Sequence, residues 1–373
     1  MKLKIAYSFF FILLIQNLYS QDFNKSFCVN PIINKNDSNK LFLRVENTNF
    51  FKNDEYFGEL TSGLTYIGAF VRPTLVYYPY SKVKITAGAH LLKYSGLDIV
   101  SQVLPVFSFQ YQPTEGINFI MGSLYGAANH SIVEPMYSFE HYLINNLENG
   151  IQLLIDKSRF YTDIWVNWEK FILKTSHSQE HILGGIHSNY IISGKKESSN
   201  LKIDFQSIFA HKGGQYHDEG ETLQTLVNMS FALKYIKKID SKYLKSLGFD
   251  AYYLTYNDVS PLPQLPYTMG YAIYSEAFIN TKLIGFKVGY WSGEYYISSK
   301  GNPLFMSVSE KNQDFLLPRT ELITAKIALR KQWFKDVVFE ARFEPYLDLQ
   351  QRQFEYSYSV YVVFNRNFFL KKL

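Results

Sequence analysis

The alternation of apolar and polar residues at the end of the chain is the feature that most constrains the fold. Over 337–344 and 355–364 the two residue types alternate with a period of two, which is typical of β-strands with one apolar and one polar face. The apolar face of the later segment is aromatic and aliphatic: Tyr356, Tyr358, Val360, Val362 and Phe364. The opposite face of that segment is polar: Glu355, Ser357 and Ser359.

Closure of the sheet is the simplest way to accommodate two such apolar strands at the end of a chain. An unpaired apolar strand exposes an edge that aggregates unless another strand pairs with it. We therefore expect the last strand to pair with the first, near Leu41–Phe51, where Arg44 and Glu46 face inward. The sequence predicts a closed barrel with an outer face that contacts lipid.

The N-terminus predicts export. Met1–Ser20 has the form of a signal peptide, with Lys2 and Lys4 before the apolar run Ile5–Ile15. No later stretch is apolar for long enough to form a membrane-spanning helix. We expect three parts: the signal peptide at 1–20, a loose periplasmic N-terminal lead-in at 21–39, and a transmembrane barrel at 40–373.

The composition fits a barrel and excludes several other classes of protein. Aromatic residues make up 17% of the chain and charged residues only 19%, as expected for a lipid-facing sheet around a polar interior. The formal net charge of +5 is too small to indicate a nucleic-acid partner. Cys28 is the only cysteine, which rules out an internal disulfide and a cysteine-rich zinc site.

About sixteen segments alternate in this way, which predicts an all-β fold: a single antiparallel up-and-down transmembrane β-barrel. The expected strands are Leu41–Phe51, Leu64–Tyr78, Val83–Tyr94, Val103–Gln112, Ile117–Tyr125, Glu148–Asp156, Phe160–Phe171, His181–Ser193, Leu201–Lys212, Leu223–Lys237, Leu247–Thr255, Tyr267–Thr281, Leu283–Trp291, Glu321–Trp333, Val337–Leu347 and Gln353–Phe364.

The connections between these strands alternate in length, which predicts their orientation. Turns such as 79–81 and 335–336 are short, whereas most of the alternate connections are longer and more polar. Outer-membrane barrels have short periplasmic turns and long extracellular loops, so we expect both termini to be periplasmic. The longest loop, 292–319, is rich in apolar residues, which leaves two alternatives: it folds into the barrel mouth, or it extends the flanking strands.

Pairs of adjacent aromatic residues are expected to mark the strand ends, where rings at headgroup depth have their apolar body in lipid and their polar tip in water. The pairs are Tyr77-Tyr78, Tyr252-Tyr253, Tyr290-Trp291, Tyr295-Tyr296 and Phe368-Phe369.

The predicted inward face carries charges of both signs. The candidate pore-lining residues are Arg44, Glu46, Arg72, Lys84, Asp163, Glu169, Lys202, Asp204, Asp250, Lys287, Lys326, Arg330, Glu340, Arg342 and Glu344. Charges inside a barrel require water or a partner of opposite charge. We favour an aqueous pore, as expected for about sixteen strands, over a packed and salt-bridged lumen without flow.

Histidines gather toward the long loops. They are His130, His141, His177, His181, His211 and His217. A metal or porphyrin site at the outer mouth is one interpretation. We favour ordinary polar loop residues, because the spacings match no known metal site. His130 and Ser131 with Glu140 and His141 also supply the atoms of a hydrolase, but no spacing brings them together. We therefore predict no catalytic residue, no metal and no cofactor.

Together, the signal peptide, the alternating aromatic strands and the aromatic C-terminal strand resemble outer-membrane β-barrels of porin type, and the Asn-, Lys- and Tyr-rich texture resembles those of Bacteroidetes. The resemblance implies a bacterial outer-membrane location and a channel for passive diffusion of small hydrophilic solutes. It also implies that the chain is not an enzyme and that its partners are outer-membrane lipid and small solutes, without nucleic acid. The alternatives are a non-conducting surface barrel for adhesion or binding and a barrel-rim hydrolase.

Overall fold

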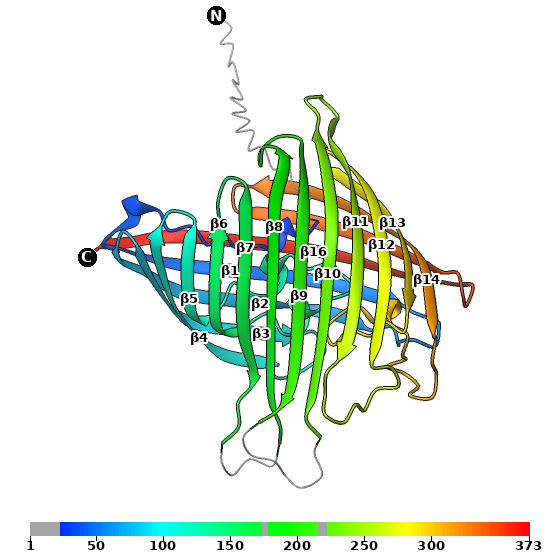
Figure 1. The fold of residues 1–373 in the computed structure, drawn as a ribbon. Helices are drawn as coiled ribbons and strands as arrows, with labels where there is room; N and C mark the ends of the chain where they lie inside the picture. Colours follow the sequence, from blue (N-terminus) through cyan, green and yellow to red (C-terminus); the bar gives the residue numbers. More distant parts are fainter. Residues whose placement is uncertain (1–22, 174–177, 215–221) are drawn as a thin grey trace, which may run out of the picture.

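The computed structural model describes residues 23–173, 178–214 and 222–373. Within these ranges, sixteen antiparallel strands form one closed barrel in which every strand pairs with its neighbours in sequence (Figure 1). The predicted fold class and strand number are confirmed. The predicted signal peptide lies outside the described residues.

The strands agree with their predicted positions to within a few residues at most ends. They are β1 (Lys40–Glu55), β2 (Thr65–Tyr80), β3 (Val83–Tyr94), β4 (Gln102–Thr114), β5 (Ile117–Ser123), β6 (Asn149–Asp156), β7 (Phe160–Lys170), β8 (Glu180–Gly194), β9 (Asn200–Gly213), β10 (Gln224–Lys238), β11 (Leu244–Asp258), β12 (Met269–Thr281), β13 (Ile284–Glu294), β14 (Arg319–Phe334), β15 (Val337–Asp348) and β16 (Gln353–Lys372). The described helices are short: η1 (Lys25–Phe27), η2 (Lys35–Asp37), η3 (Ala127–His130), α1 (His141–Ile144) and η4 (Pro303–Phe305).

Closure occurs where the sequence predicts it. Strand β1 pairs with β16 along the whole length of β1, from Lys40 opposite Lys372 to Glu55 opposite Tyr356. This seam removes the exposed edge that an apolar terminal strand would otherwise leave.

The two ends of the barrel differ. At one end, tight turns such as 81–82 and 335–336 connect the strands, and β1 begins and β16 ends there (Figure 1). We call this the short-turn end. The opposite, long-loop end carries most of the longer connections, including 124–148 and 295–318. The loop asymmetry still predicts that the short-turn end faces the periplasm.

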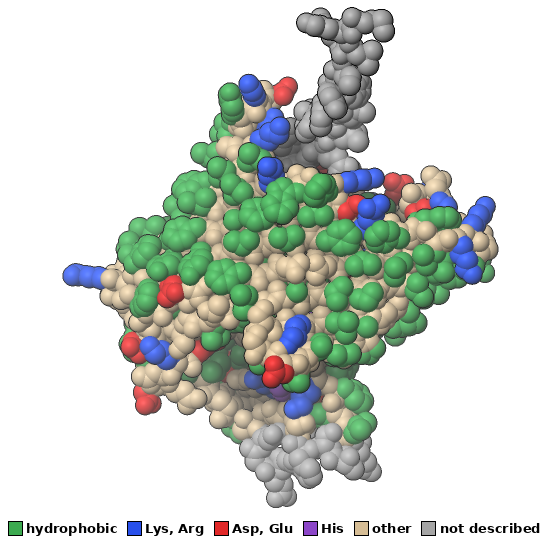
Figure 2. Space-filling model, turned by 180° about the vertical axis from the view of Figure 1, so that it is seen from behind, with side chains coloured by type: hydrophobic (Ala, Val, Ile, Leu, Met, Phe, Trp, Pro, Cys, Tyr) green, Lys and Arg blue, Asp and Glu red, His purple; other side chains and the backbone are tan. Residues whose placement is uncertain are grey.

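The outer wall is apolar. Large hydrophobic side chains such as Phe107, Phe231, Phe249 and Ile273 are exposed there, and Figure 2 shows hydrophobic side chains spread over the surface of the barrel. Their exposure is explained if lipid, and not water, surrounds the wall.

No helix within the described ranges is long and apolar enough to cross a membrane.

The first part of the N-terminal segment, 23–33, packs against the inner wall of the barrel and is not a loose lead-in, whereas Asn34, Lys35 and Asn36 are exposed. The periplasmic location of this segment stays a prediction. Phe23, Phe27 and Ile33 are buried. The carbonyl oxygen of Phe23 accepts hydrogen bonds from Arg330 and Arg342, at 2.8 and 2.7 Å. These few apolar side chains hold the segment against the inner wall. The segment is mostly polar, so its composition alone did not indicate this packing.

The aromatic pairs do not place both of their rings at headgroup depth, as the expectation for strand ends required. Adjacent residues of a strand face opposite sides of a sheet. Tyr253 and Tyr290 are exposed on the outer wall, whereas their neighbours Tyr252 and Trp291 are buried in the lumen. Only one ring of each of these pairs can therefore contact lipid.

Candidate functional site

Two loops fill the lumen at the long-loop end. The loop 124–148 and the loop 295–318 fold inward and are joined by hydrogen bonds to main-chain carbonyl groups. The amide of Ser138 donates to the carbonyl of Lys300 at 2.8 Å, and the Tyr296 hydroxyl donates to the carbonyl of Pro135 at 3.3 Å. Of the two alternatives for the longest loop, folding into the mouth is confirmed.

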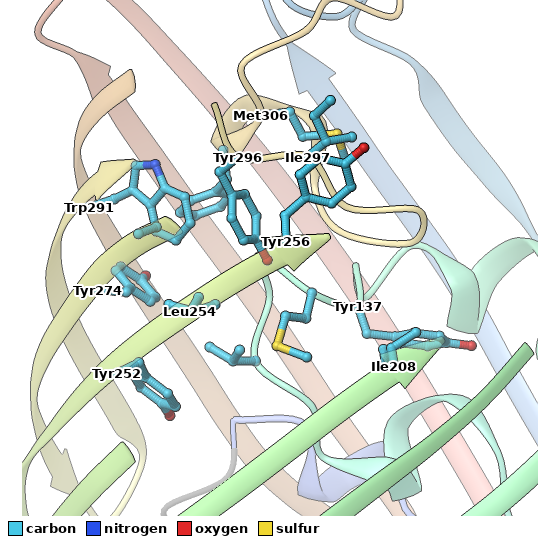
Figure 3. Packing of buried hydrophobic residues seen from close by; sticks show 14 of the residues in the cluster. Tyr137, Ile208, Tyr252, Leu254, Tyr256, Tyr274, Trp291, Tyr296, Ile297 and Met306 are labelled. Carbon is cyan, nitrogen blue, oxygen red and sulfur yellow. The ribbon is translucent and has the colours of Figure 1, made fainter. Parts of the chain in front are cut away.

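A cluster of aromatic side chains packs these loops against the wall (Figure 3). The Trp291 ring meets the rings of Tyr296 and Phe305 edge-on, at 5.0 and 5.1 Å between centroids. All three side chains are at most 1% exposed. Tyr295, in contrast, is 43% exposed and has a φ of 53°, so the chain turns sharply where it leaves β13.

A polar cavity of about 450 Å³ remains in the lumen on the short-turn side of this cluster. Loop residues such as Val133 and Phe305 line it, and so do Lys157, Arg159 and Lys196 from the turns of the short-turn end. The cavity therefore reaches from the packed loops to the short-turn end.

The predicted charged residues all lie on the lumenal face, where most have partners. Arg330 and Arg342 both bind Glu340, at 2.9 and 2.7 Å. Lys326 binds Glu344 at 2.5 Å. Whether such side chains line a conducting pore stays a prediction.

The remaining lumenal charges have partners that the sequence did not suggest. Arg44 and Arg72 bind Glu46, Lys84 contacts Tyr125, Glu169 binds Lys300 at 2.6 Å, and Lys287 binds Glu276 at 3.1 Å. Lys202, Asp204 and Asp250 line the cavity.

His130 forms a buried acid–base cluster in the lumen. Its Nδ1 lies 2.7 Å from Asp163 and its Nε2 lies 2.9 Å from Glu148, while its ring stacks on Trp165 at 3.6 Å. The Tyr137 hydroxyl also donates to Glu148, at 2.9 Å. Both ring nitrogens are occupied and the side chain is inaccessible to solvent, so this cluster fixes the loop 124–148 to the wall.

A second imidazole, His187, lies beside the cavity. Its Nε2 is 2.9 Å from Asp204, and its Nδ1 is 2.8 Å from the carbonyl oxygen of His130. Ser131 also lines the cavity, so a serine, a histidine and an acid do meet in the lumen. Since both nitrogens of His187 already have partners, the imidazole is not placed to take a proton from Ser131.

The other loop histidines that the structure describes do not form a site together. His141 is bonded to the Lys300 carbonyl at 3.1 Å, within the loops that fill the lumen. His177 and His217 lie outside the described residues. In the described part of the chain, no group of His, Cys, Asp and Glu is arranged to hold a metal ion.

His211 lies on the outer wall, near the end of β9 at the long-loop end. On the same strand, the even-numbered residues Asp204, Gln206 and Ile208 are buried in the lumen. Successive residues of a strand face opposite sides of the sheet, so the odd-numbered residues, among them the exposed Phe209 and His211, face the lipid. On the adjacent strand β10, the Thr225 hydroxyl lies 2.8 Å from His211 Nδ1. A hydroxyl and an imidazole in this arrangement can act as nucleophile and general base.

Polar contacts surround this pair. The Thr225 amide donates to the Ser260 hydroxyl at 2.8 Å, which fixes the start of β10. Residue Ile182 of β8 lies opposite His211, and two residues earlier Glu180 accepts a hydrogen bond from the Trp168 indole at 2.7 Å. The wall here combines apolar rings with hydrogen-bonding groups, as an interface between lipid tails and headgroups requires.

The sequence named His211 but missed Thr225. Both residues occupy the outward positions of neighbouring strands, so the alternation identifies the face on which each lies. The register that sets them side by side, Thr225 opposite His211, is a property of the paired strands and is not evident from either strand alone.

The fold is shared with solved outer-membrane proteins. OmpT of Vibrio cholerae, in a form lacking loop L8, has a TM-score of 0.51 at 9% identity, and the similarity covers 87% of this chain and 99% of that chain. OprD of Pseudomonas aeruginosa has a TM-score of 0.51 at 10% identity over 88% and 94% of the two chains. OprB of Pseudomonas putida has a TM-score of 0.50 at 5% identity over 88% and 94%. The similarity, together with the closed barrel, confirms the outer-membrane location.

Comparison of the sequence with protein-family models identifies the family of this chain. No curated protein is significantly similar to it. The model described as lipid A 3'-O-deacylase-type matches residues 33–373, which is nearly the whole barrel. Because this is a family of enzymes, the expectation that the chain is not an enzyme is wrong. The resemblance to outer-membrane barrels holds, but the porin type within that group is not supported. The chain belongs to the lipid A 3'-O-deacylase-type family.

Proposed function

We propose that this protein hydrolyses an ester-linked acyl chain of lipid A at its outer wall, with Thr225 and His211 as the reacting groups. The observation that carries the proposal is the 2.8 Å contact between the Thr225 hydroxyl and His211 Nδ1 on the lipid-facing side of the barrel. The family supports the substrate and the reaction.

The position of the pair fits a substrate that stays in the membrane. Both residues lie near the ends of their strands at the long-loop end, which the loop asymmetry predicts to be extracellular. The outer leaflet is where lipid A would meet the wall, with its acyl esters close to headgroup depth. The lumenal histidines have no such access, because the wall separates them from lipid.

The chemistry is that of acyl transfer to a hydroxyl group. Thr225 Oγ1 attacks the ester carbonyl carbon while His211 Nδ1 takes the hydroxyl proton. The tetrahedral intermediate then collapses, the bond to the sugar oxygen breaks, and His211 returns the proton to that oxygen. Water attacks the acyl-threonine in a second step, with His211 again as the base. The bond between the acyl carbon and Thr225 Oγ1 breaks, His211 returns the proton to Oγ1, and the fatty acid is released.

Fatty-acid release from lipid A tests this proposal. Mature protein in detergent is mixed with lipid A micelles, and the products are identified by mass spectrometry. We expect His211→Asn and Thr225→Val each to lower the rate by about 10²-fold or more, the usual contribution of a general base or nucleophile.

Thr162→Val is the matched control. Thr162 also bonds across the outer wall, to the Ser188 hydroxyl at 2.8 Å, but no imidazole is part of that pair. This variant should retain the wild-type rate. Full activity of both His211→Asn and Thr225→Val would exclude the pair as the reacting groups.

Passive diffusion of solutes is the second candidate function. The observation that favours it is the cavity of about 450 Å³ lined by charged residues. The packed loops 124–148 and 295–318 lie between this cavity and the long-loop end, so conduction would require them to move. Single-channel conductance in a planar bilayer, combined with the absence of fatty-acid release, would favour the channel.

A further inference from the structure

The wall of the lumenal cavity carries charges in blocks of like sign. Across β9 and β10, Lys202 lies directly opposite Lys234, and across β11 and β12, Asp250 lies directly opposite Glu276. The four residues form one row, since Lys234 is also opposite Asp250. A second lysine pair follows, with Lys287 opposite Lys326 across β13 and β14.

Like charges directly opposite each other on neighbouring strands are unfavourable. Ion pairs offset part of this repulsion, because Lys234 binds Asp204 and Lys287 binds Glu276, each at 3.1 Å. A row in which basic and acidic residues alternated would stabilise the sheet more, because each residue would then lie opposite one of the other sign. The blocks instead divide the cavity wall into a basic and an acidic part, which suits a ligand with separate anionic and hydrogen-donating groups.

One atom on the acidic part shows where a donor is missing. Asp250 is 9% exposed, and its Oδ1 has no hydrogen-bond partner among the described residues. Its Oδ2 has a long contact of 3.4 Å with the Tyr252 hydroxyl. A buried carboxylate oxygen normally has a partner, so this one marks a place for a hydroxyl or amine of a bound molecule.

The approach to the cavity is basic. Lys157, Arg159, Lys196 and Lys238 line it near the short-turn end together with one acidic residue, Glu197, and basic residues outnumber acidic ones over the lining as a whole. A cleft with an excess of one sign of charge concentrates ligands of the opposite sign. The volume of about 450 Å³ is within the usual range for a small-molecule site.

We propose that this cavity binds a small anionic solute that also carries hydroxyl groups, of the sugar-phosphate type, and that the solute enters from the short-turn end. The lysine pairs bind the anion and Asp250 accepts a hydrogen bond from a hydroxyl group. This inference is independent of the proposed deacylation, because it concerns the lumen and not the outer wall.

Calorimetric titration of the mature protein at low ionic strength tests the ligand class. The probes are glucose 6-phosphate, inorganic phosphate and glucose. We expect saturable binding of glucose 6-phosphate, weaker binding of phosphate by about tenfold, and no measurable binding of glucose. Equal affinity for glucose and glucose 6-phosphate, or no saturable binding of either anion, would overturn the proposal. This comparison uses wild-type protein, so it does not depend on the folding of a variant.

Substitutions locate the site. Lys202→Gln combined with Lys326→Gln should weaken glucose 6-phosphate binding by about tenfold or more. Asp250→Asn should reduce the preference for glucose 6-phosphate over phosphate. The control pair, Lys331→Gln with Lys335→Gln, lies outside the cavity lining and should bind as wild type. The same loss in the control pair would contradict a site in the cavity.

Cysteine labelling tests the direction of access. Lys202→Cys is made in a Cys28→Ser background, which contains no other cysteine. A membrane-impermeant sulfonated maleimide should label it in isolated outer-membrane fragments but not in intact cells. Equal labelling in intact cells would show that the cavity opens outward, contrary to the proposal.

Discussion

His130 and His211 carry the same side chain on opposite sides of one barrel wall, and their surroundings give them different capacities. In the lumen, His130 has an acid on each ring nitrogen, Asp163 at 2.7 Å and Glu148 at 2.9 Å, and is inaccessible to solvent. On the outer wall, His211 is half-buried and bonds a hydroxyl through Nδ1. The first arrangement holds a loop in place, whereas the second can move a proton.

The comparison teaches that polar residues grouped in sequence need not act together. His130, Ser131, Glu140 and His141 looked like the parts of a hydrolase, but their loop folds into the lumen and each imidazole is used to pack it. The pair that fits catalysis comes from two different strands. A reacting group needs access to its substrate as well as suitable partners, and the barrel wall decides that access.

The largest effect on stability is expected for His130→Leu. The substitution leaves Asp163 and Glu148 buried without the imidazole between them, and removing one partner of a buried ionic cluster costs about 3–5 kcal/mol. Unfolding in urea, followed by tryptophan fluorescence, measures the change, since Trp165 stacks on His130.

His211→Asn provides the contrast to His130→Leu. It should change the free energy of unfolding by less than about 1 kcal/mol, as is usual for a surface position. Equal destabilisation by the two variants would remove the distinction between a structural and a chemical histidine.

The strands were predictable because alternation has a physical cause. Between lipid and a polar lumen, every second residue must be apolar, and a sequence with this pattern fixes the strands and their faces. The predicted strand Val83–Tyr94 has the same bounds in the structure. The closing pair β1 and β16 followed from the need to cover an apolar edge.

The loops and the N-terminal segment were harder to predict because no period governs them. Apolar residues such as Phe305 hinted that loop 295–318 folds inward, but nothing in the sequence shows that it would meet Pro135 of another loop. The burial of Phe23 and Phe27 was not predicted, because they are isolated apolar residues in a segment that is otherwise polar. The pairing of His211 with Thr225 depends on strand register, which long-range contacts set.

A charge on the outer wall is expected to have an intermediate effect. Val166 faces outward on β7, where it lies between Ile151 and Gly184 of the neighbouring strands. Val166→Arg should cost roughly 2–4 kcal/mol if this position lies near the middle of the membrane.

The matched substitution is Asn189→Arg, which points the same charge into the cavity. There the guanidinium can remain hydrated, so the effect on folding should be smaller. Gel mobility of the folded barrel compares the two variants. The reverse order would mean that the assigned faces of β7 and β8 are wrong.

The smallest effect is expected for Thr225→Ser, which separates the chemistry of the outer-wall pair from its packing. Serine keeps the Oγ that contacts His211 and loses only a methyl group and the rotamer restriction of a β-branched side chain. If the hydroxyl is the nucleophile, fatty-acid release should stay within about tenfold of wild type, a loss attributable to less exact positioning. Thr225→Val keeps the shape and removes the hydroxyl, and should be far slower. If instead Thr225 only packs against the imidazole, the order reverses, because valine preserves the branched side chain better than serine does.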